Sequence, residues 1–247
     1  MCRHKEFIKF IFFLFLLIWS VQGFAQNENF ASDRPGLSDA PDLIGKNQWQ
    51  IASGFDLSQY NHYQLWQLST NTLKFRISKH LEARMDFGIQ YDRDKHIYGT
   101  VGPSFGIKGL LLPAKGIIPK TAVIVEFYPP PFSSQQQAAG VALELCFANN
   151  WGSNSFYYNF GYDRIDFSSK GTSSILLGYQ YQFNTKFAAF TEFYGFFPSQ
   201  SSTNNYVTDV GITYQLNKKL QLDLTAGRDL SRPSGNSFSQ GGITYNF

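Results

Sequence analysis

The stretch Leu81-Glu82-Ala83-Arg84-Met85-Asp86-Phe87-Gly88-Ile89-Gln90-Tyr91 alternates strictly between two kinds of side chain. One face carries Leu, Ala, Met, Phe, Ile and Tyr, and the other carries Glu, Arg, Asp, Gly and Gln. This period of two is typical of a β-strand that lies between two different environments. Its length matches the roughly 9–11 residues of a tilted strand that crosses a membrane, and it exceeds the roughly 5–6 residues of a usual soluble strand. The stretch therefore predicts a membrane-spanning strand.

The same alternation recurs from Lys46 to the end of the chain. Twelve segments share it: 46–57, 63–77, 81–92, 98–111, 119–128, 138–148, 154–165, 173–183, 187–197, 205–216, 220–229 and 238–247. They predict an all-β fold, an antiparallel, up-and-down transmembrane β-barrel of about twelve strands. Roughly ten or fourteen strands are the alternatives, because the longest segments leave room for bends.

The connections between these segments fall into two classes. One class is short and polar, at 78–80, 149–152, 184–186 and 217–219, with the slightly longer 113–118. The other class is generally longer and more irregular, at 58–62, 93–97, 129–137, 166–172, 198–204 and 230–237. The two classes alternate along the chain, as they do in outer-membrane barrels with short periplasmic turns and longer outer loops. Trp49 and Trp151 adjoin the predicted periplasmic ends, with Tyr179 and Tyr181, where aromatic side chains favour the membrane interface.

Residues 1–25 have the pattern of a secretory signal peptide. A basic start precedes an apolar run over residues 7–21, and the small residues Gly23 and Ala25 favour cleavage before Gln26. The alternative, an uncleaved anchor, is disfavoured because the run is shorter than the roughly 20 residues of a spanning helix. We therefore predict a signal peptide over 1–25, an amino-terminal segment over 26–45 and a barrel over 46–247.

The charge balance argues against nucleic-acid binding, and the cysteine count argues against an intramolecular disulfide. Of the 21 basic and 18 acidic side chains, the signal peptide removes Arg3, Lys5, Lys9 and Glu6, which leaves 18 and 17. A nearly neutral chain predicts no nucleic-acid partner. Cys146 is then the only mature cysteine, so no intramolecular disulfide is expected.

Cofactor motifs are not found in the sequence. His62, His80 and His96 lack metal-ligand spacing, and no phosphate loop or dinucleotide fingerprint occurs. We therefore expect neither a metal nor another cofactor.

The carboxy-terminal residues point to the outer membrane as the location. Ile243, Tyr245 and Phe247 alternate, and the chain ends on Phe. This resembles the terminal signal of outer-membrane proteins, which implies that the barrel-insertion machinery recognises Phe247. Outer-membrane lipid is the other expected partner of the barrel.

The inward face of the predicted barrel carries charges of both signs. The alternation places eleven charged side chains there: Lys74, Arg76, Glu82, Arg84, Asp86, Lys108, Glu126, Glu144, Glu192, Asp209 and Asp223. A barrel of about twelve strands lies between the filled interior of eight and the open channel of sixteen to eighteen, so its bore is narrow. These charges are candidates for a permeation role. The alternative is that acids and bases only neutralise one another across a wet lumen.

The segment 26–45 differs from the rest of the mature chain. It is polar, contains Pro35 and Pro41 and has no period, so it is not a strand. We expect it to fold into the lumen as a plug, with Asp33, Arg34 and Pro35 engaging the lumen wall. The alternative is a loose periplasmic tail.

Four stretches resemble a known family. They are Ala31-Ser32-Asp33-Arg34-Pro35-Gly36-Leu37-Ser38-Asp39-Ala40-Pro41, Gly45-Lys46-Asn47-Gln48-Trp49-Gln50-Ile51-Ala52-Ser53-Gly54-Phe55, Leu73-Lys74-Phe75-Arg76-Ile77-Ser78-Lys79-His80-Leu81-Glu82-Ala83-Arg84 and Thr191-Glu192-Phe193-Tyr194-Gly195. The mature chain is similar to the family of outer-membrane transporters named after the MetA pathway of phenol degradation. Ala52-Ser53 departs from the pattern, because an acidic residue is common there. The resemblance implies an outer-membrane barrel that moves small aromatic or apolar molecules.

Two other functions compete with a channel or transporter. A barrel lipid hydrolase would need a Ser–His pair near the outer rim, where His62, His96, Ser58 and Ser69 lie, but no His-x-Ser spacing places a pair on one strand face. A structural or adhesive barrel would use its loops to bind a partner, for example at 129–132. We predict a channel rather than an enzyme.

Overall fold

The computed structural model describes residues 30, 32–33, 36, 38–59, 64–130, 138–164, 167, 170–201, 203–231 and 236–247. The predicted signal peptide and its cleavage site lie outside these residues, as do Arg34, Pro35 and His62. Within the described ranges, no helix is long and apolar enough to cross a membrane.

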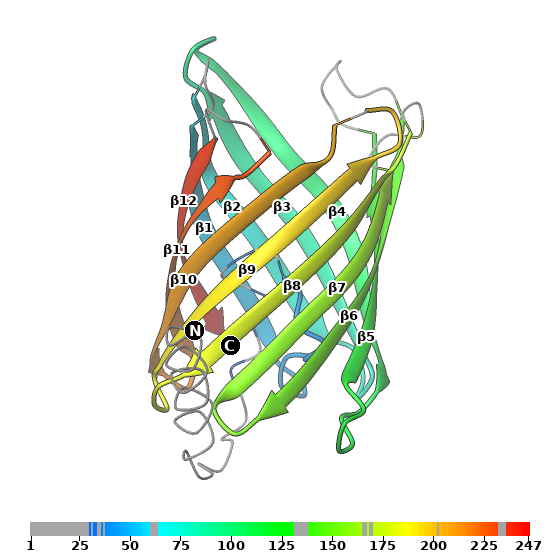
Figure 1. Ribbon diagram of the computed structural model, residues 1–247, viewed down its shortest axis with the longest axis vertical. Coiled ribbons are helices and arrows are strands. Elements are labelled where there is room, and N and C mark those ends of the chain that lie inside the picture. Colours follow the sequence, from blue (N-terminus) through cyan, green and yellow to red (C-terminus); the bar gives the residue numbers. More distant parts are fainter. Residues whose placement is uncertain are drawn as a thin grey trace, which may run out of the picture.

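Twelve antiparallel strands close into one barrel (Figure 1). The strands are β1 (Trp49–Gln59), β2 (Gln64–Arg76), β3 (Leu81–Asp92), β4 (Ile97–Leu112), β5 (Lys120–Tyr128), β6 (Gly140–Trp151), β7 (Asn154–Arg164), β8 (Thr172–Gln182), β9 (Phe187–Pro198), β10 (Asn205–Asn217), β11 (Leu220–Asp229) and β12 (Ser237–Asn246). Each strand pairs with its neighbours in sequence, and β1 pairs with β12 to close the sheet. Closure matters in lipid because it leaves no edge of unpaired backbone groups. The predicted fold and strand number are confirmed.

The two longest predicted segments contain irregularities rather than extra strands. The β2–β3 register shifts between Gln67 and Ser69, and the β3–β4 register shifts between Asp86 and Gly88. A bulge adds a residue to one strand and lets it bend without ending. The strand count therefore stays at twelve.

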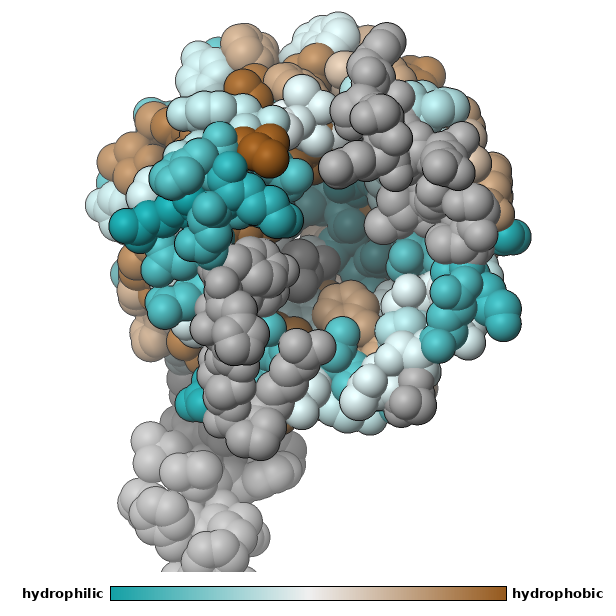
Figure 2. All heavy atoms as spheres, turned by 90° about the horizontal axis from the view of Figure 1, so that it is seen from above, coloured by the Kyte–Doolittle hydropathy of each residue, from teal (hydrophilic) through white to brown (hydrophobic). Residues whose placement is uncertain are grey.

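The two faces of each strand see different surroundings, as the alternation predicts. On the outer face of the barrel, Leu222 and Leu224 of β11 are 39% and 54% exposed. On the inner face, Asp223 and Thr225 of the same strand are 7% and 1% exposed. Apolar side chains on the outside meet lipid, and polar side chains on the inside line the lumen. Seen from above, the barrel mouth is hollowed and its visible interior is mostly hydrophilic (Figure 2).

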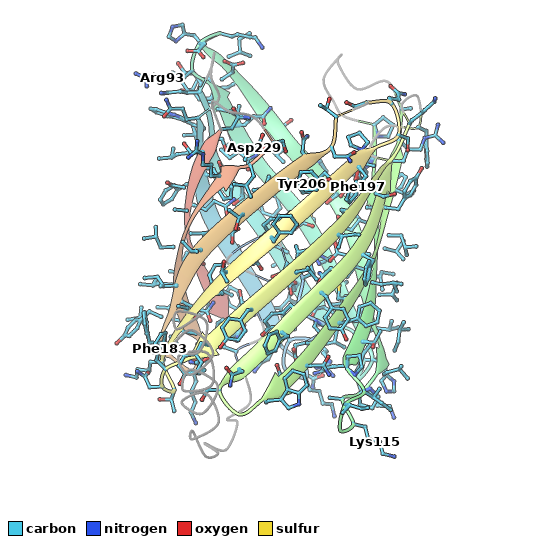
Figure 3. The ribbon with its side chains drawn as sticks, viewed as in Figure 1. Arg93, Lys115, Phe183, Phe197, Tyr206 and Asp229 are labelled. Carbon is cyan, nitrogen blue, oxygen red and sulfur yellow. The ribbon has the colours of Figure 1, made fainter. Side chains whose placement is uncertain are left out.

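Aromatic side chains gather at both ends of the barrel. At the end with the short turns, Trp151 contacts Phe156 with ring centroids 5.6 Å apart, and Phe156 contacts Tyr179 at 5.0 Å. At the other end, Tyr206 contacts Phe193 and Phe197 at 6.1 and 6.2 Å. Figure 3 shows Phe183 and Lys115 at the first end and Arg93 and Asp229 at the second. The two groups match the aromatic girdles that outer-membrane barrels place at the membrane interfaces.

Candidate functional site

The candidate site is the lumen, which is lined by β1–β12 and entered by the described part of the segment 26–45. The register places Lys74 opposite Arg84, and Glu82 opposite Lys108. These four side chains are at most 9% exposed. Lys74 and Arg84 carry like charges at directly opposed positions, which is unfavourable unless an anion lies between them.

Asp33 is that anion. Its carboxylate accepts a hydrogen bond from Lys74 Nζ, lies 2.9 Å from Lys108 Nζ and lies 3.7 Å from Arg84 Nη1. Burial opposes ionisation of Asp33, but the charges of Lys108, Lys74 and Arg84 outweigh it and hold the pKa of this carboxyl well below its ordinary value. Asp33 therefore places one negative charge within a cluster of three cations from β2, β3 and β4.

Two further acids of the segment extend the same contact. Asp39 Oδ1 lies 2.9 Å from Arg84 Nη1, and Asp42 Oδ1 accepts a hydrogen bond from Lys120 Nζ at 2.5 Å. Arg84 also reaches the wall acid Glu126, with Nε and Oε1 3.2 Å apart. The acids of the segment thus pair with cations of β2 to β5.

Glycine makes room for the Arg84–Glu126 pair. Gly106 lies between the two residues in the sheet register. A Cβ added at Gly106 would lie 2.7 Å from Arg84 Cγ and 3.0 Å from Glu126 Cγ. A larger residue would push the two charged side chains apart.

Backbone groups of the segment also bond to the lumen wall. The Ile44 amide donates to Glu82 Oε2 at 2.8 Å, and Asn159 Nδ2 donates to the Asp39 carbonyl at 2.9 Å. Asn159 also donates to Glu144. Because these carbonyl and amide groups lack strand partners, the wall side chains satisfy them.

The segment also touches the wall on the side of β9 and β12. Ser38 Oγ donates to Glu192, and Ser32 Oγ lies 3.0 Å from Thr244 Oγ1. Gly36 has a φ of 93°, and a Cβ at this position would lie 2.1 Å from Glu192 Oε2. The positive φ therefore favours glycine here, and a side chain would also displace the Glu192 carboxylate. The described part of the segment spans the lumen from β2–β5 to β9 and β12.

Of the remaining candidates, Asp86 joins the same cluster, with its Oδ2 3.7 Å from Arg84 Nε, and the others lie elsewhere. Tyr194 OH, which has one proton to donate, lies within hydrogen-bonding distance of Glu192 and, at 3.0 Å, of Asp209 Oδ2, so it links these two acids. Asp223 is buried on β11 opposite Gly242. Arg76 lies at the turn end, where its Nε donates to the Ser78 carbonyl at 2.8 Å and its Nη1 donates to the Ile44 carbonyl of the segment.

Several residues of the site were not singled out by the sequence patterns. They are Gly36, Ser38, Asp39, Asp42, Lys120, Asn159 and Tyr194. Lys120 has the inward parity of its strand, and Asp39 and Asp42 are the other acids of the described part of the segment, so register and charge could have identified these three. No periodic signal marks Ser38, and the inward parity of Asn159 does not identify its partner Asp39, which lies far away in sequence.

The rim residues considered for hydrolysis do not form a Ser–His pair in the described chain. His96 lies in the loop between β3 and β4, with its Nδ1 2.9 Å from Tyr91 OH. Ser58 Oγ donates to Asp56 Oδ1 at 2.5 Å, and Ser69 Oγ accepts from Asn71 Nδ2 at 3.3 Å. Over the same described ranges, no group of three or more His, Cys, Asp and Glu side chains could hold a metal ion.

Solved structures of outer-membrane proteins share the fold of this chain. The chain is similar to the COG4313 outer membrane channel from Pseudomonas putida F1, with a TM-score of 0.61, 10% identity and coverage of 84% of this chain and 98% of that one. It is also similar to the KdgM porin, with a TM-score of 0.56, 10% identity and coverage of 80% and 99%. At this identity the likeness establishes the architecture, an outer-membrane type of β-barrel.

Family comparison identifies the chain more closely. No curated protein sequence matches it. A family model described as "Putative MetA-pathway of phenol degradation" matches residues 32–247, which covers the amino-terminal segment from Ser32 onward and the whole barrel. The resemblance seen in the sequence is confirmed, and the chain belongs to this family.

Proposed function

We propose that this protein is an outer-membrane channel for small aromatic or apolar molecules, and that the segment 26–45 is a plug that narrows its lumen. The observation that carries the proposal is Asp33, which is 12% exposed and lies among Lys74, Lys108 and Arg84. A loose tail would not bring a carboxylate into a cluster of wall cations, since removing these charges from water is costly unless they pair.

The cargo class follows from the family and the architecture. The family description names phenol degradation, and the two solved structures that share the fold are described as a channel and a porin. A narrow lumen with charges of both signs selects small solutes over large ones. We propose transport rather than catalysis, because the His96 ring forms a hydrogen bond with Tyr91 OH and, among the described residues, with no serine.

Single-channel conductance in planar bilayers tests the plug. We expect the intact protein to conduct ions poorly. Deletion of residues 27–44, or the double change Asp33→Ala and Arg34→Ala, should raise the conductance several-fold because the lumen opens and its wall charges become available to ions.

The matched control removes one acid and one arginine outside the lumen. Arg93 and Asp94 lie in the loop between β3 and β4, so Arg93→Ala with Asp94→Ala should leave the conductance unchanged. Equal conductance before and after the deletion would refute the plug and leave the barrel standing. A hydrolase would lose lipid hydrolysis on mutation of His62 or His96 instead, and an adhesive barrel would show neither effect.

A further inference from the structure

The outward face of the barrel carries almost no charge. In the twelve strands, the sheet register turns every acidic side chain and every lysine towards the lumen. Two arginines have the opposite orientation. Arg164 of β7 shares its face with Phe160, which is 47% exposed, and Arg228 of β11 shares its face with Leu224, which is 54% exposed. Arg164 and Arg228 are therefore the only charged side chains that the described strands place on the lipid face.

Both arginines lie at the loop end of the barrel. Arg164 is the last residue of β7, and Arg228 precedes the last residue of β11. Figure 3 shows this end at Asp229, the neighbour of Arg228, and the turn end at Lys115. The longer loops mark the outer side of the membrane, so the two arginines lie at the level of the outer leaflet. Charge is tolerated better near either interface than at the midplane, so tolerance alone does not explain why only this end carries it.

The two arginines differ in what holds them. Arg164 Nη2 donates to the Phe167 carbonyl at 2.5 Å, and the guanidinium carbon lies 5.5 Å from the centre of the Phe167 ring. The side chain of Arg228 is exposed, and among the residues that the structure describes it has no ion pair and no hydrogen bond. A guanidinium stays charged at any physiological pH and carries only donors. The donors of Arg228 therefore face the membrane around the barrel.

Hydroxyl groups and apolar side chains surround Arg228 in a fixed order. Ser237 of β12 lies directly opposite Arg228, and Ser237 and Ser239 are both exposed on the outward face. Closer to the midplane, Leu224 and Val210 are 54% and 60% exposed on the same side of the sheet. We call Arg228, Ser237 and Ser239 the Arg228 patch. It places a cation and two hydroxyls at the level of lipid head groups, above apolar side chains at the level of acyl chains.

These groups match the chemistry of a phosphorylated glycolipid. Arginine binds phosphate through parallel, charge-assisted hydrogen bonds, and serine hydroxyls both donate to and accept from the hydroxyls of a sugar. Lipopolysaccharide, the main lipid of the outer leaflet, has a phosphorylated sugar head group, lipid A, with acyl chains below it. The positive patch and the negative phosphate are complementary, and no outward acid of the described strands opposes them.

We propose that the Arg228 patch binds lipopolysaccharide, with Arg228 on a phosphate of lipid A and Ser237 and Ser239 on its sugars. This inference goes beyond the proposed function, because it requires a barrel in the outer membrane but neither a particular cargo nor the plug.

Native mass spectrometry of the refolded protein in detergent, titrated with bisphosphorylated lipid A, measures this binding. We expect the wild type to retain lipid A. Arg228→Gln should weaken the apparent Kd about 5- to 20-fold, because it removes a charge-assisted contact with phosphate. Arg228→Lys keeps the charge but loses the paired donors, so it should weaken the Kd about 2- to 5-fold.

The matched control removes positive charge from the opposite end of the barrel. Lys218 and Lys219 lie in the turn between β10 and β11, so Lys218→Gln with Lys219→Gln should change the Kd by less than about 2-fold. Lipid A without phosphates should bind equally to the wild type and to Arg228→Gln. The shift of each variant's band on heating before electrophoresis shows that it has folded. If Arg228→Gln does not fold, Arg228→Lys decides with the same probes.

Phosphatidylglycerol separates a glycolipid from any other lipid with a phosphate. Ser237→Ala with Ser239→Ala should weaken binding of lipid A about 2- to 5-fold and leave binding of phosphatidylglycerol unchanged. Equal loss for both lipids, or phosphatidylglycerol binding as tightly as lipid A, would show a general phosphate contact and overturn the glycolipid. Wild-type affinity of the Arg228 variants, equal loss in the lysine control, or the same loss with dephosphorylated lipid A would overturn the site itself. Each of these results leaves the proposed channel standing, because its conductance is measured separately in planar bilayers.

Discussion

At the scale of single residues, the arrangement of the lumen depends on Asp33, because this one carboxylate faces three cations. Asp33→Asn keeps the size of the side chain but removes its charge and leaves Lys74, Arg84 and Lys108 without this partner. Breaking a buried ion pair typically costs about 3–5 kcal/mol, so we expect a clearly lower midpoint of thermal unfolding in detergent. Asp92→Asn is the control, because Asp92 pairs with Lys95, which is 73% exposed, and such surface pairs are worth about 0–1 kcal/mol. Equal midpoints for the two variants would show that Asp33 does not hold the segment.

At the scale of one element, β11 tests which face meets lipid. An arginine on the lipid face near the membrane midplane costs about 2–4 kcal/mol, whereas the lumen tolerates charge. Leu222 is 39% exposed on the outer face and Asp223 is 7% exposed on the inner face. We therefore expect Leu222→Arg to impair insertion and Asp223→Arg to do so much less, as measured by the amount of folded barrel in membranes. Similar losses from this adjacent pair, or the reverse order, would contradict the register of β11.

At the scale of the whole molecule, the end of the chain helps to close the barrel. The Phe247 amide donates to the Trp49 carbonyl at 2.9 Å, and the rings of Tyr245 and Phe247 lie 5.0 Å apart. Deletion of Phe247 removes one hydrogen bond, worth about 0.5–1.5 kcal/mol, so refolded protein should still shift its band on heating. The amount inserted in cells should fall, because the terminal aromatic is the expected signal for the insertion machinery. Unchanged insertion in cells would show that the insertion machinery does not depend on Phe247.

Location is a second prediction for the whole molecule. If residues 1–25 are a cleaved signal peptide, the mature protein begins at Gln26 and fractionates with outer membranes. Amino-terminal sequencing and membrane fractionation measure both properties. Detection of Met1 at the amino terminus, or recovery from the soluble periplasm, would contradict the prediction.

The sequence by itself determined the strands and the side on which their residues lie, and it predicted about twelve strands, the number that the closed sheet confirms. Alternation has a period of two, and a slip of one residue would turn every apolar side chain into the lumen, so the pattern determines the face without any tertiary information. The pattern predicted the ends of the strands less accurately than their faces. The first strand begins at Trp49 and not at Lys46 because Asn47 has a φ of 57° and the Gln48 amide bonds to the Gly45 carbonyl at 3.2 Å, which makes a turn.

The tertiary structure alone decided which lumen residues meet. Asp33 and Lys74 are 41 residues apart, and Asn159 and Asp39 are 120 apart. Periodicity says that Lys74 and Asn159 face inward, but it says nothing of where an aperiodic segment lies across the lumen. Closure of the barrel brings distant strands around one narrow space, and the cost of burying their charges selects the partners. For that reason the strands could be predicted from the sequence, whereas the ion pairs of the segment form only once the barrel has closed.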